Sequence, residues 1–258
     1  MPRAEHHPFR ERRTLYAVVI PVINEGEKIL GQLARMRELG LMDLADVLLA
    51  DGGSIDGSLE PGRLAGLGVR ALLIKRDQGR LGAQLRMGYA YALQEGYQGV
   101  VTIDGNGKDG VEAIPRFVAA LLSGVDYAQA SRFLPGGRGV NTPLIRTLAI
   151  RLIHAPAVSL AAGRWLSDTT QGFRAYSRRY LLHPAVQPFR EIFQEYELLA
   201  YLSARASQLG LAVSQIPTTR IYPASGPTPT KIKSLAAYGD LLAVLWNLNL
   251  GRYAPPGA

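Results

Sequence analysis

The sequence of 258 residues contains no cysteine, no signal peptide and no long uninterrupted apolar run. Without cysteine there is no disulfide, no thiolate zinc site and no cysteine nucleophile. The first residues are charged and lack the apolar core of a signal peptide, and no stretch reaches the roughly 18 apolar residues that a membrane span needs. Since the apolar content of 47% is ordinary for a globular protein, we expect a soluble, cytoplasmic protein.

Acidic residues are nearly absent from one long stretch of the chain. From Arg132 to Arg190 there are nine arginines and one acid, Asp168, so this stretch carries +8, the net charge of the whole protein. Such a charge favours a phosphorylated partner: a nucleotide diphosphate, a lipid phosphate or an anionic membrane surface. The alternative explanation of the basic stretch is a bias toward arginine in the whole chain, without a functional role. A nucleic-acid partner is not expected, because interleaved aromatic residues and a recognisable binding module are both missing.

The first half alternates short apolar runs with helical patterns. Apolar residues at helical spacing predict helices over 25–39, 81–94 and 111–122. The runs between them are apolar throughout, which predicts a mostly parallel sheet covered by helices on both faces. Ligands of such sheets bind at the carboxyl ends of the strands. The predicted strands of this half are 15–20, 46–50, 69–74, 99–103 and 126–130.

The second half follows a different pattern. Pro135–Gly139 predicts a mobile loop, and a long apolar helix is predicted over 144–162, with a break or kink at Pro156. The stretch 234–250 predicts an amphipathic helix that packs on the body or lies on a membrane surface. Further elements are predicted over 173–176 (strand), 191–209 (helix) and 211–216 (strand). We expect a flexible segment at 1–13, one domain at 14–231 with halves 14–131 and 132–231, and a helix and tail at 232–258.

Polar residues follow three of the predicted strands of the first half. The loops read Pro21-Val-Ile-Asn-Glu25, Asp51-Gly-Gly-Ser-Ile-Asp-Gly-Ser58 and Asp104-Gly-Asn-Gly-Lys-Asp109. Side chains of this kind can anchor a base, a ribose or, through Asp104 and Asn106, a hard cation on a diphosphate. Each loop has a structural alternative, since the same residues also cap helices and form glycine turns.

A fourth polar loop, Asp168-Thr-Thr-Gln-Gly-Phe-Arg174, lies in the basic stretch. Asp168 is either a counter-ion of the surrounding arginines or a general base that acts on the acceptor.

The order and spacing of these motifs resemble the family 2 glycosyltransferases with a GT-A fold, and within them the dolichyl- or polyprenyl-phosphate sugar synthases. The resemblance runs from about Tyr16 to Lys233. It also includes motifs outside the four loops: Gly79-x-Leu-Gly-Ala83 with Arg86 and Gly88, Ala130-Ser-Arg132-Phe133, Glu197, Pro217 and Lys231.

The resemblance implies an inverting hexosyltransferase that moves a sugar from a nucleotide-diphosphate sugar to a polyprenyl phosphate. It implies a Rossmann-like nucleotide-binding half followed by an acceptor half, and an enzyme that works peripherally at the inner face of the membrane. Asp104 and Asn106 would hold a divalent cation, Mg²⁺ or Mn²⁺. Arg132, Asp168 and Lys231 would be the catalytic residues. The nucleotide sugar would contact Pro21, Ile23, Glu25, Asp51, Gly53, Arg86, Asp104, Gly105 and Asn106.

The chain departs from the family pattern at three positions. Gly52 stands where a second acid of the nucleotide loop is usual, Asn106 replaces the second metal aspartate, and Lys108 adds a positive charge nearby. The lost negative charge weakens the attraction for a cation, so Lys108 is an alternative neutraliser of the leaving diphosphate. Two alternative functions follow: the same enzyme class with a soluble hydroxyl acceptor, for which Asp168 would act as base, and a non-catalytic nucleotide- or glycan-binding protein.

Overall fold

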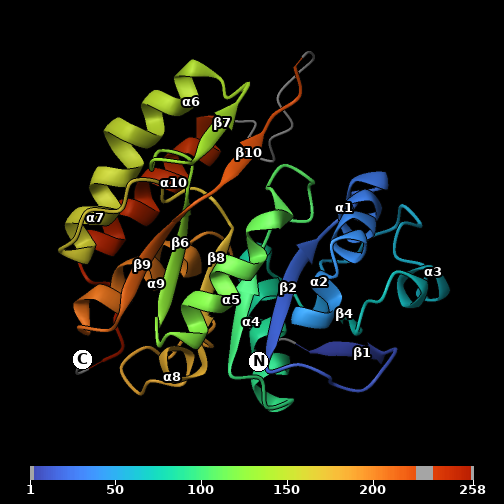
Figure 1. Ribbon diagram of the computed structural model, residues 1–258. Coiled ribbons are helices and arrows are strands. Elements are labelled where there is room, and N and C mark those ends of the chain that lie inside the picture. The colour runs from blue at the N-terminus through green and yellow to red at the C-terminus, as the bar shows by residue number, and fades with distance from the viewer. Residues whose placement is uncertain (1–2, 225–234, 257–258) are drawn as a thin grey trace.

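The computed structural model describes residues 3–224 and 235–256. An eight-stranded sheet runs through the molecule in the order β1-β4-β3-β2-β5-β8-β6-β9, with helices on both faces (Figure 1). A small parallel pair, β7 and β10, stands above its upper end. The strands are β1 (Ala4–Pro8), β2 (Tyr16–Val22), β3 (Asp46–Asp51), β4 (Ala71–Lys75), β5 (Gly99–Thr102), β6 (Tyr127–Ser131), β7 (Arg138–Val140), β8 (Arg174–Ser177), β9 (Val213–Pro217) and β10 (Thr219–Ile221).

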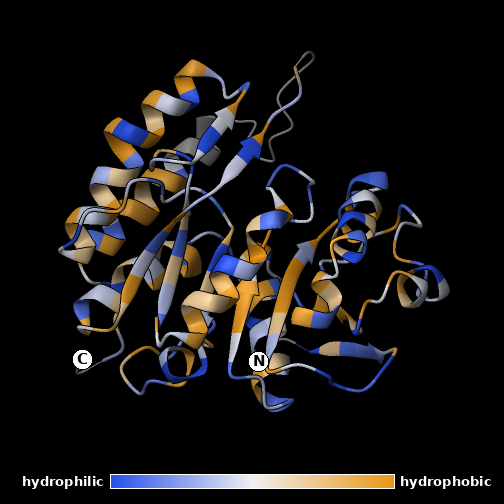
Figure 2. Ribbon diagram, in the orientation of Figure 1, coloured by the Kyte–Doolittle hydropathy of each residue, from blue (hydrophilic) through white to orange (hydrophobic). Residues whose placement is uncertain are grey.

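Four adjacent strands, β4, β3, β2 and β5, are parallel. The loops after β2, β3 and β5 therefore leave the same edge of the sheet, which brings together the three polar loops of the first half. All residues of β2, β3 and β5 are buried, and Figure 2 shows β2 as largely hydrophobic. Antiparallel pairing joins β8 to β5 and β6, and a parallel pair joins β6 to β9. The mixed sheet confirms the predicted α/β class.

The two faces of the sheet carry separate cores. Val19 and Ala50 face α4 (Leu81–Gln94) and α9 (Glu197–Gln208). Val18 and Leu49, one residue earlier on each strand, face α1 (Glu27–Glu38) and α5 (Ile114–Leu122). This alternation follows from the period of two in a strand.

The other helices are α2 (Leu41–Leu44), α3 (Pro61–Gly66), α6 (Leu144–Ala149), α7 (Ala155–Ala162), α8 (Arg178–Leu181) and α10 (Leu235–Asn249), with short 3₁₀ and π segments at Val111–Ala113 and Ile150–His154.

The expectation of a flexible segment over residues 1–13 is wrong for Ala4–Pro8. These residues form the edge strand β1, antiparallel to β4. Ion pairs of Arg3 with Asp77 and of Glu5 with Arg76 hold the strand to the chain that follows β4. The sequence AEHHP has no apolar run, so no strand pattern is visible in it. The predicted loop Pro135–Gly139 likewise extends into β7, which pairs with β10.

Pro156 does not break the long apolar helix of the second half. Residues 144–162 are helical throughout, but Ile150–His154 adopt a π-helix, and α7 starts just before the proline. Proline has no N–H to donate to the preceding turn. In the π-helical turn before the proline, the backbone hydrogen bonds span five residues and not four. The helix continues past the proline.

Close packing of α4 on the sheet depends on Gly88. A Cβ atom at this position would lie 2.6 Å from Cγ1 of Val19. We expect Gly88→Ala to lower the free energy of unfolding by about 1–3 kcal/mol, because the overpacked helix must shift away from β2. Gly31→Ala in α1 is the matched control, since nothing lies within 4 Å of its added Cβ, and it should stabilise the helix slightly. Urea unfolding measures both; equal stability of the two variants would contradict this packing account.

Candidate active site

Loops from β2 and β3 are tied to each other at the carboxyl edge of the sheet. Oδ1 of Asn24 accepts a hydrogen bond from the Ile55 N–H at 2.9 Å, and the Asn24 N–H donates to Oγ of Ser54 at 3.0 Å. Asp51, nearly fully buried, accepts from the N–H and the hydroxyl of Ser54 at 2.9 and 2.6 Å. Asp51 thus fixes the shape of its own loop, and Ile23 and Glu25 lie in the loop bonded to it.

Gly52 has a packing reason to be glycine. The side chain of Gln84, in the first turn of α4, donates through Nε2 to the carbonyls of Val22 and Ala50 at 2.8 and 3.0 Å. A Cβ atom at Gly52 would lie 2.8 Å from that same Nε2. An acid at position 52, as in the family pattern, would displace the Gln84 side chain. Glycine at position 52 is therefore needed for the two hydrogen bonds that Gln84 donates to the carbonyls of Val22 and Ala50.

Asp104 lies where the loop after β5 meets the second half of the chain. Its Oδ2 is 3.4 Å from Nη2 of Arg220 and 3.5 Å from Nδ2 of Asn106. Its Oδ1 packs directly against Gly172, where an added Cβ would lie only 2.2 Å away. The structure therefore brings the predicted Asp104 and Asn106 together, and Gly172 makes room for the carboxylate.

Arg220 on β10 joins the loop after β5 to the second half. Its guanidinium forms an ion pair with the buried Asp109, and the backbone of Ile221 donates to the Lys108 carbonyl at 2.8 Å. Burial would lower the pKa of Arg220, but the charges of Asp109 and Asp104 outweigh it and hold the pKa above its ordinary value. The guanidinium is therefore a permanent positive charge beside Asp104.

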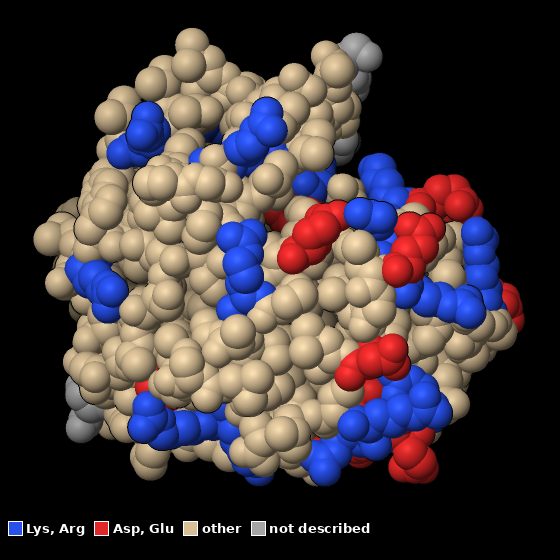
Figure 3. Space-filling model, in the orientation of Figure 1, with Lys and Arg blue, Asp and Glu red and all other residues tan. Residues whose placement is uncertain are grey.

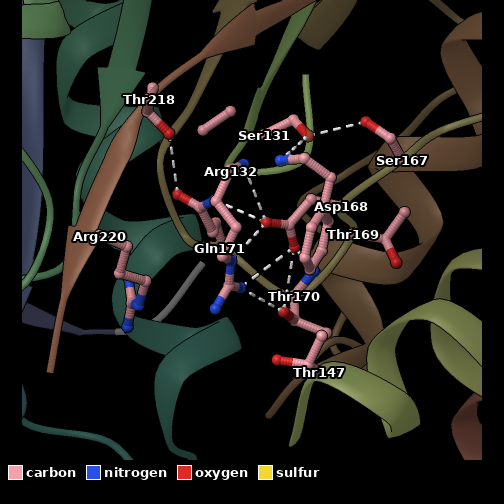
Figure 4. A network of polar contacts seen from close by, with 12 residues as sticks. Ser131, Arg132, Thr147, Ser167, Asp168, Thr169, Thr170, Gln171, Thr218 and Arg220 are labelled. Atoms are coloured by element: carbon pink, nitrogen blue, oxygen red, sulfur yellow. Dashed lines mark hydrogen bonds and ion pairs between the residues drawn. The ribbon is translucent and has the colours of Figure 1, made fainter. Parts of the chain in front are cut away.

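Arg132 and Asp168 form a fully buried ion pair (Figure 4). Oδ2 of Asp168 accepts from Nε of Arg132 at 2.7 Å and from Nε2 of Gln171 at 2.6 Å; Oδ1 accepts from Nη2 of Arg132 and from Oγ1 of Thr170, each at 3.2 Å. Burial would raise the pKa of Asp168, but Arg132 and these donors lower it below the ordinary value. Both oxygens of the carboxylate are occupied.

Three arginines converge on the hydroxyl of Tyr222. Nη1 of Arg132 and Nη1 of Arg146 each lie 3.4 Å from it, and Nε of Arg220 lies 3.3 Å from it. Nζ of Lys108 lies 5.4 Å from the centre of the Tyr222 ring. Burial would raise the pKa of Tyr222, but the three arginines lower it. We call these five residues the Tyr222 cluster.

The other predicted site residues lie in β2, in α4 and in the loops after β3 and β5. Arg86 in α4 is buried and donates to the Phe189 carbonyl at 3.2 Å. Pro21 is inside β2, and Gly53 and Gly105 lie in the loops after β3 and β5. Lys231 falls outside the described residues.

The sequence did not reveal the roles of Arg146, Arg220 and Tyr222. Arg146 was counted in the charge of the basic stretch, but no sequence motif includes Arg220 or Tyr222.

Comparisons with known proteins identify relatives of this chain. The chain is 30% identical to polyprenol monophosphomannose synthase of Mycolicibacterium smegmatis over 81% of this chain and 77% of that protein. It is 28% identical to undecaprenyl-phosphate mannosyltransferase of Micrococcus luteus over 78% of this chain and 81% of that protein. No protein-family model matches the chain.

Solved structures show the same fold. Glucosyl-3-phosphoglycerate synthase of Mycobacterium tuberculosis, crystallised with Mn²⁺, UDP and phosphoglyceric acid, superposes with a TM-score of 0.66 at 18% identity, over 95% of this chain and 80% of that one.

The fold and these relatives define a glycosyltransferase with a GT-A fold. The chain belongs to the family 2 glycosyltransferases that include the polyprenyl-phosphate sugar synthases.

The contact between Gly172 and Asp104 can be tested by one methyl group. We expect Gly172→Ala to push the Asp104 carboxylate out of place and to weaken binding of a nucleotide diphosphate with Mg²⁺ at least about tenfold, or about 1.4 kcal/mol. Isothermal titration calorimetry measures the affinity. Gly66→Ala, where nothing lies within 4 Å of the added Cβ, is the control. Unchanged affinity in a folded Gly172→Ala protein would show that Asp104 does not hold the donor.

His154, in the π-helical turn, should make the protein sensitive to mild acid. Burial and the charge of Arg174 lower its pKa to about 4, against the opposing effect of Asp168. Because an unfolded histidine has a pKa of about 6.5, the unfolded state gains a proton first, and stability should fall by up to about 3 kcal/mol between pH 6.5 and 4. Above pH 6.5 this loss is absent. Urea unfolding across this range measures it; His154→Gln should flatten the slope, and an equally steep slope in that variant would refute the assignment.

Proposed function

We propose that the protein transfers a sugar from a nucleotide-diphosphate sugar to a polyprenyl phosphate, with inversion at the anomeric carbon. The observation that carries this proposal is the convergence of Arg132, Arg146 and Arg220 on Tyr222. Two of these arginines are neutralised, by Asp168 and Asp109. Among the described residues, no ion pair joins Arg146 to a carboxylate. A phosphate group would supply the missing negative charge, and guanidinium groups match its geometry.

The state of Asp168 favours a phosphate acceptor over a hydroxyl acceptor. A hydroxyl must lose a proton in the reaction, and the base that takes it must reach it. Asp168 has no exposed side-chain surface, and four donors occupy its oxygens. We assign it the role of orienting Arg132. An acceptor phosphate is already ionised and needs no base.

The reaction then needs only positioning and charge neutralisation. An oxygen of the acceptor phosphate forms the bond to the anomeric carbon, while the bond from that carbon to the donor diphosphate breaks. The electron pair leaves with the nucleoside diphosphate, and no proton is transferred. Arg132 and Arg146 hold the attacking phosphate, and preorganised positive charge of this kind stabilises the transition state.

The donor lies, in this proposal, over the loops that contain Ile23, Glu25, Asp51 and Gly53, in the half formed by residues 14–131. Asp104 and Asn106 offer a carboxylate and an amide oxygen, hard ligands of the type that Mg²⁺ or Mn²⁺ prefers. No group of three or more acidic or histidine side chains within residues 3–224 and 235–256 is arranged for a metal. Nδ2 of Asn106 faces Asp104, and its Oδ1 accepts from the Lys108 N–H at 3.2 Å. A cation here would therefore be held mainly by Asp104 and completed by the Asn106 oxygen, the donor diphosphate and water. Such a cation would neutralise the leaving diphosphate. Lys108 and Arg220 would add positive charge there, since Nη2 of Arg220 lies 3.4 Å from Oδ2 of Asp104.

A variant of Arg146 tests the proposed function. Arg146→Gln removes a charge-assisted contact, commonly about 1.5–3 kcal/mol, so kcat/KM for a polyprenyl phosphate should fall about 10- to 100-fold. Binding of the nucleotide sugar, measured by thermal shift with Mg²⁺, should be unchanged. Arg116→Gln, an exposed arginine on α5, is the control. An unchanged kcat/KM in Arg146→Gln would contradict the placement of the acceptor phosphate.

Metal dependence is checked in the same thermal-shift experiment. A cation that binds through only two protein oxygens should depend on the donor, so Mg²⁺ alone should shift the melting temperature little, and Mg²⁺ with the preferred nucleotide diphosphate much more. Equal shifts with nucleotide plus chelator and with nucleotide plus Mg²⁺ would exclude a cation at Asp104 and Asn106.

A further inference from the structure

The helix α6 carries one residue of the Tyr222 cluster, although none of the residues of α6 is buried. Nη1 of its Arg146 lies 3.4 Å from the Tyr222 hydroxyl. By contrast, α7 packs against α9 and α10. Figure 1 shows α6 and α7 as one continuous helical segment, with α6 at its upper end. Core packing of α6 itself therefore does not determine where Arg146 lies.

Carboxylates do not hold this helical segment either. No Asp or Glu occurs from Tyr127 to Ser167. The upper left of Figure 3, over α6 and α7, shows blue and tan atoms without red. No ion pair in the described part of the chain includes Arg146 or Arg151. The position of Arg146 therefore depends on other contacts of the segment.

The π-helical turn Ile150–His154 supplies such a contact. Nδ1 of His154 and Oγ1 of Thr169 are hydrogen-bonded at 2.6 Å, and Thr169 is buried. Figure 4 shows Thr169 on the side of Asp168 that faces away from the Arg132 guanidinium. The turn is thus joined to the loop that contains Asp168. Single π-helical turns inside α-helices are frequent at functional sites.

A second contact joins the same turn to the arginine of the buried ion pair. The guanidinium carbon of Arg151 lies 5.1 Å from the centre of the Phe133 ring, and that of Arg132 lies 5.6 Å from the same ring. Phe133 is therefore within cation–π distance of both arginines. Through Thr169 and Phe133, the turn is connected to Asp168 and to Arg132.

Two arginines that meet at Tyr222 are linked by the hydrogen bond in this turn. Nη1 of Arg132 and Nη1 of Arg146 each lie 3.4 Å from the Tyr222 hydroxyl. Arg132 is held by the carboxylate that precedes Thr169 in the sequence, and Arg146 belongs to the helical segment that contains His154. The bond between His154 and Thr169 fixes that segment to the loop, and with it the distance between the two guanidinium groups.

We propose that His154 is a positioning residue of the transfer reaction: its hydrogen bond with Thr169 braces α6, so that Arg132 and Arg146 bind one phosphate group together. We call this hydrogen bond the α6 brace. His154 itself contacts neither the donor nor the acceptor. The proposal rests on the proposed function for the phosphate, whereas the α6 brace is independent of catalysis. Without the brace, α6 has no buried residue that would keep it in place.

Hydrogen exchange tests the α6 brace without any substrate. Thr169→Val removes the hydroxyl and keeps the shape of the side chain, so the helical amides of residues 147–149 should exchange at least about threefold faster, and those of α4 at the unchanged rate. Thr169→Ser, which keeps the hydroxyl, should exchange like the unchanged protein.

The matched control is Tyr180→Phe in α8. It removes a buried hydrogen bond of the same length, 2.6 Å, from the Tyr180 hydroxyl to the Leu202 carbonyl, so it should leave the exchange of α6 unchanged. Unchanged exchange of α6 in Thr169→Val, or an equal acceleration in Tyr180→Phe, would overturn the proposal.

Kinetics tests whether the α6 brace acts through Arg146. Thr169→Val should lower kcat/KM for a polyprenyl phosphate about three- to tenfold, mainly by raising KM, and should leave binding of the nucleotide sugar unchanged. Thr169→Ser should retain the original kcat/KM. In an Arg146→Gln background, Thr169→Val should have no further effect on kcat/KM, although its cost in urea unfolding remains.

Two kinetic results would contradict the positioning role. One is an unchanged KM for the acceptor in Thr169→Val, and the other is an equal fall of kcat/KM with and without Arg146. Absence of transfer by the unchanged protein would reject the proposed function, while the exchange of residues 147–149 still shows whether the α6 brace exists.

Discussion

Buried guanidinium groups held by carboxylates are the constraint on which the second half of the site depends. Arg132 is paired with Asp168 and Arg220 with Asp109, and both arginines meet at the hydroxyl of Tyr222. Removing one carboxylate from such a pair commonly costs about 3–5 kcal/mol, because a buried charge is left uncompensated. The same pairs therefore set the geometry of the site and contribute to the specificity of the fold. Arg220 also lies beside Asp104, so one side chain connects the donor corner with the Tyr222 cluster.

The parallel strands supply the second constraint, since they bring separate loops to one edge. Apolar runs in the sequence were sufficient to predict β2, β3, β4 and β5, because a strand buried on both faces has a distinct composition. The strand β1 could not be predicted in this way, since its residues are polar and it is held by pairing with β4. The pair β7 and β10 is also short and partly exposed. Its pairing depends on tertiary packing that no local pattern expresses.

The candidate site shows the same division between local and tertiary information. The motifs indicated Asp51 and Asp104, because each lies at the end of a predicted strand, and Asp168, because it lies beside a glycine turn. The roles of Arg220 and Tyr222 were not visible, since they depend on a strand more than 100 residues away from Asp104 in the chain. The reason for glycine at positions 52 and 172 could not be predicted from the sequence either. Gly52 makes room for the side chain of Gln84, and Gly172 makes room for that of Asp104, each from another element.

The central claim is that the Tyr222 cluster receives a phosphate. The most direct test compares a polyprenyl phosphate with the corresponding free polyprenol as acceptors, with a mixture of nucleotide-diphosphate sugars as donors and product detection by mass spectrometry. The account predicts a sugar-phosphate-polyprenol product and no transfer to the free alcohol, because Asp168 is not available as a base. Efficient transfer to the free alcohol, with none to the phosphate, would contradict it.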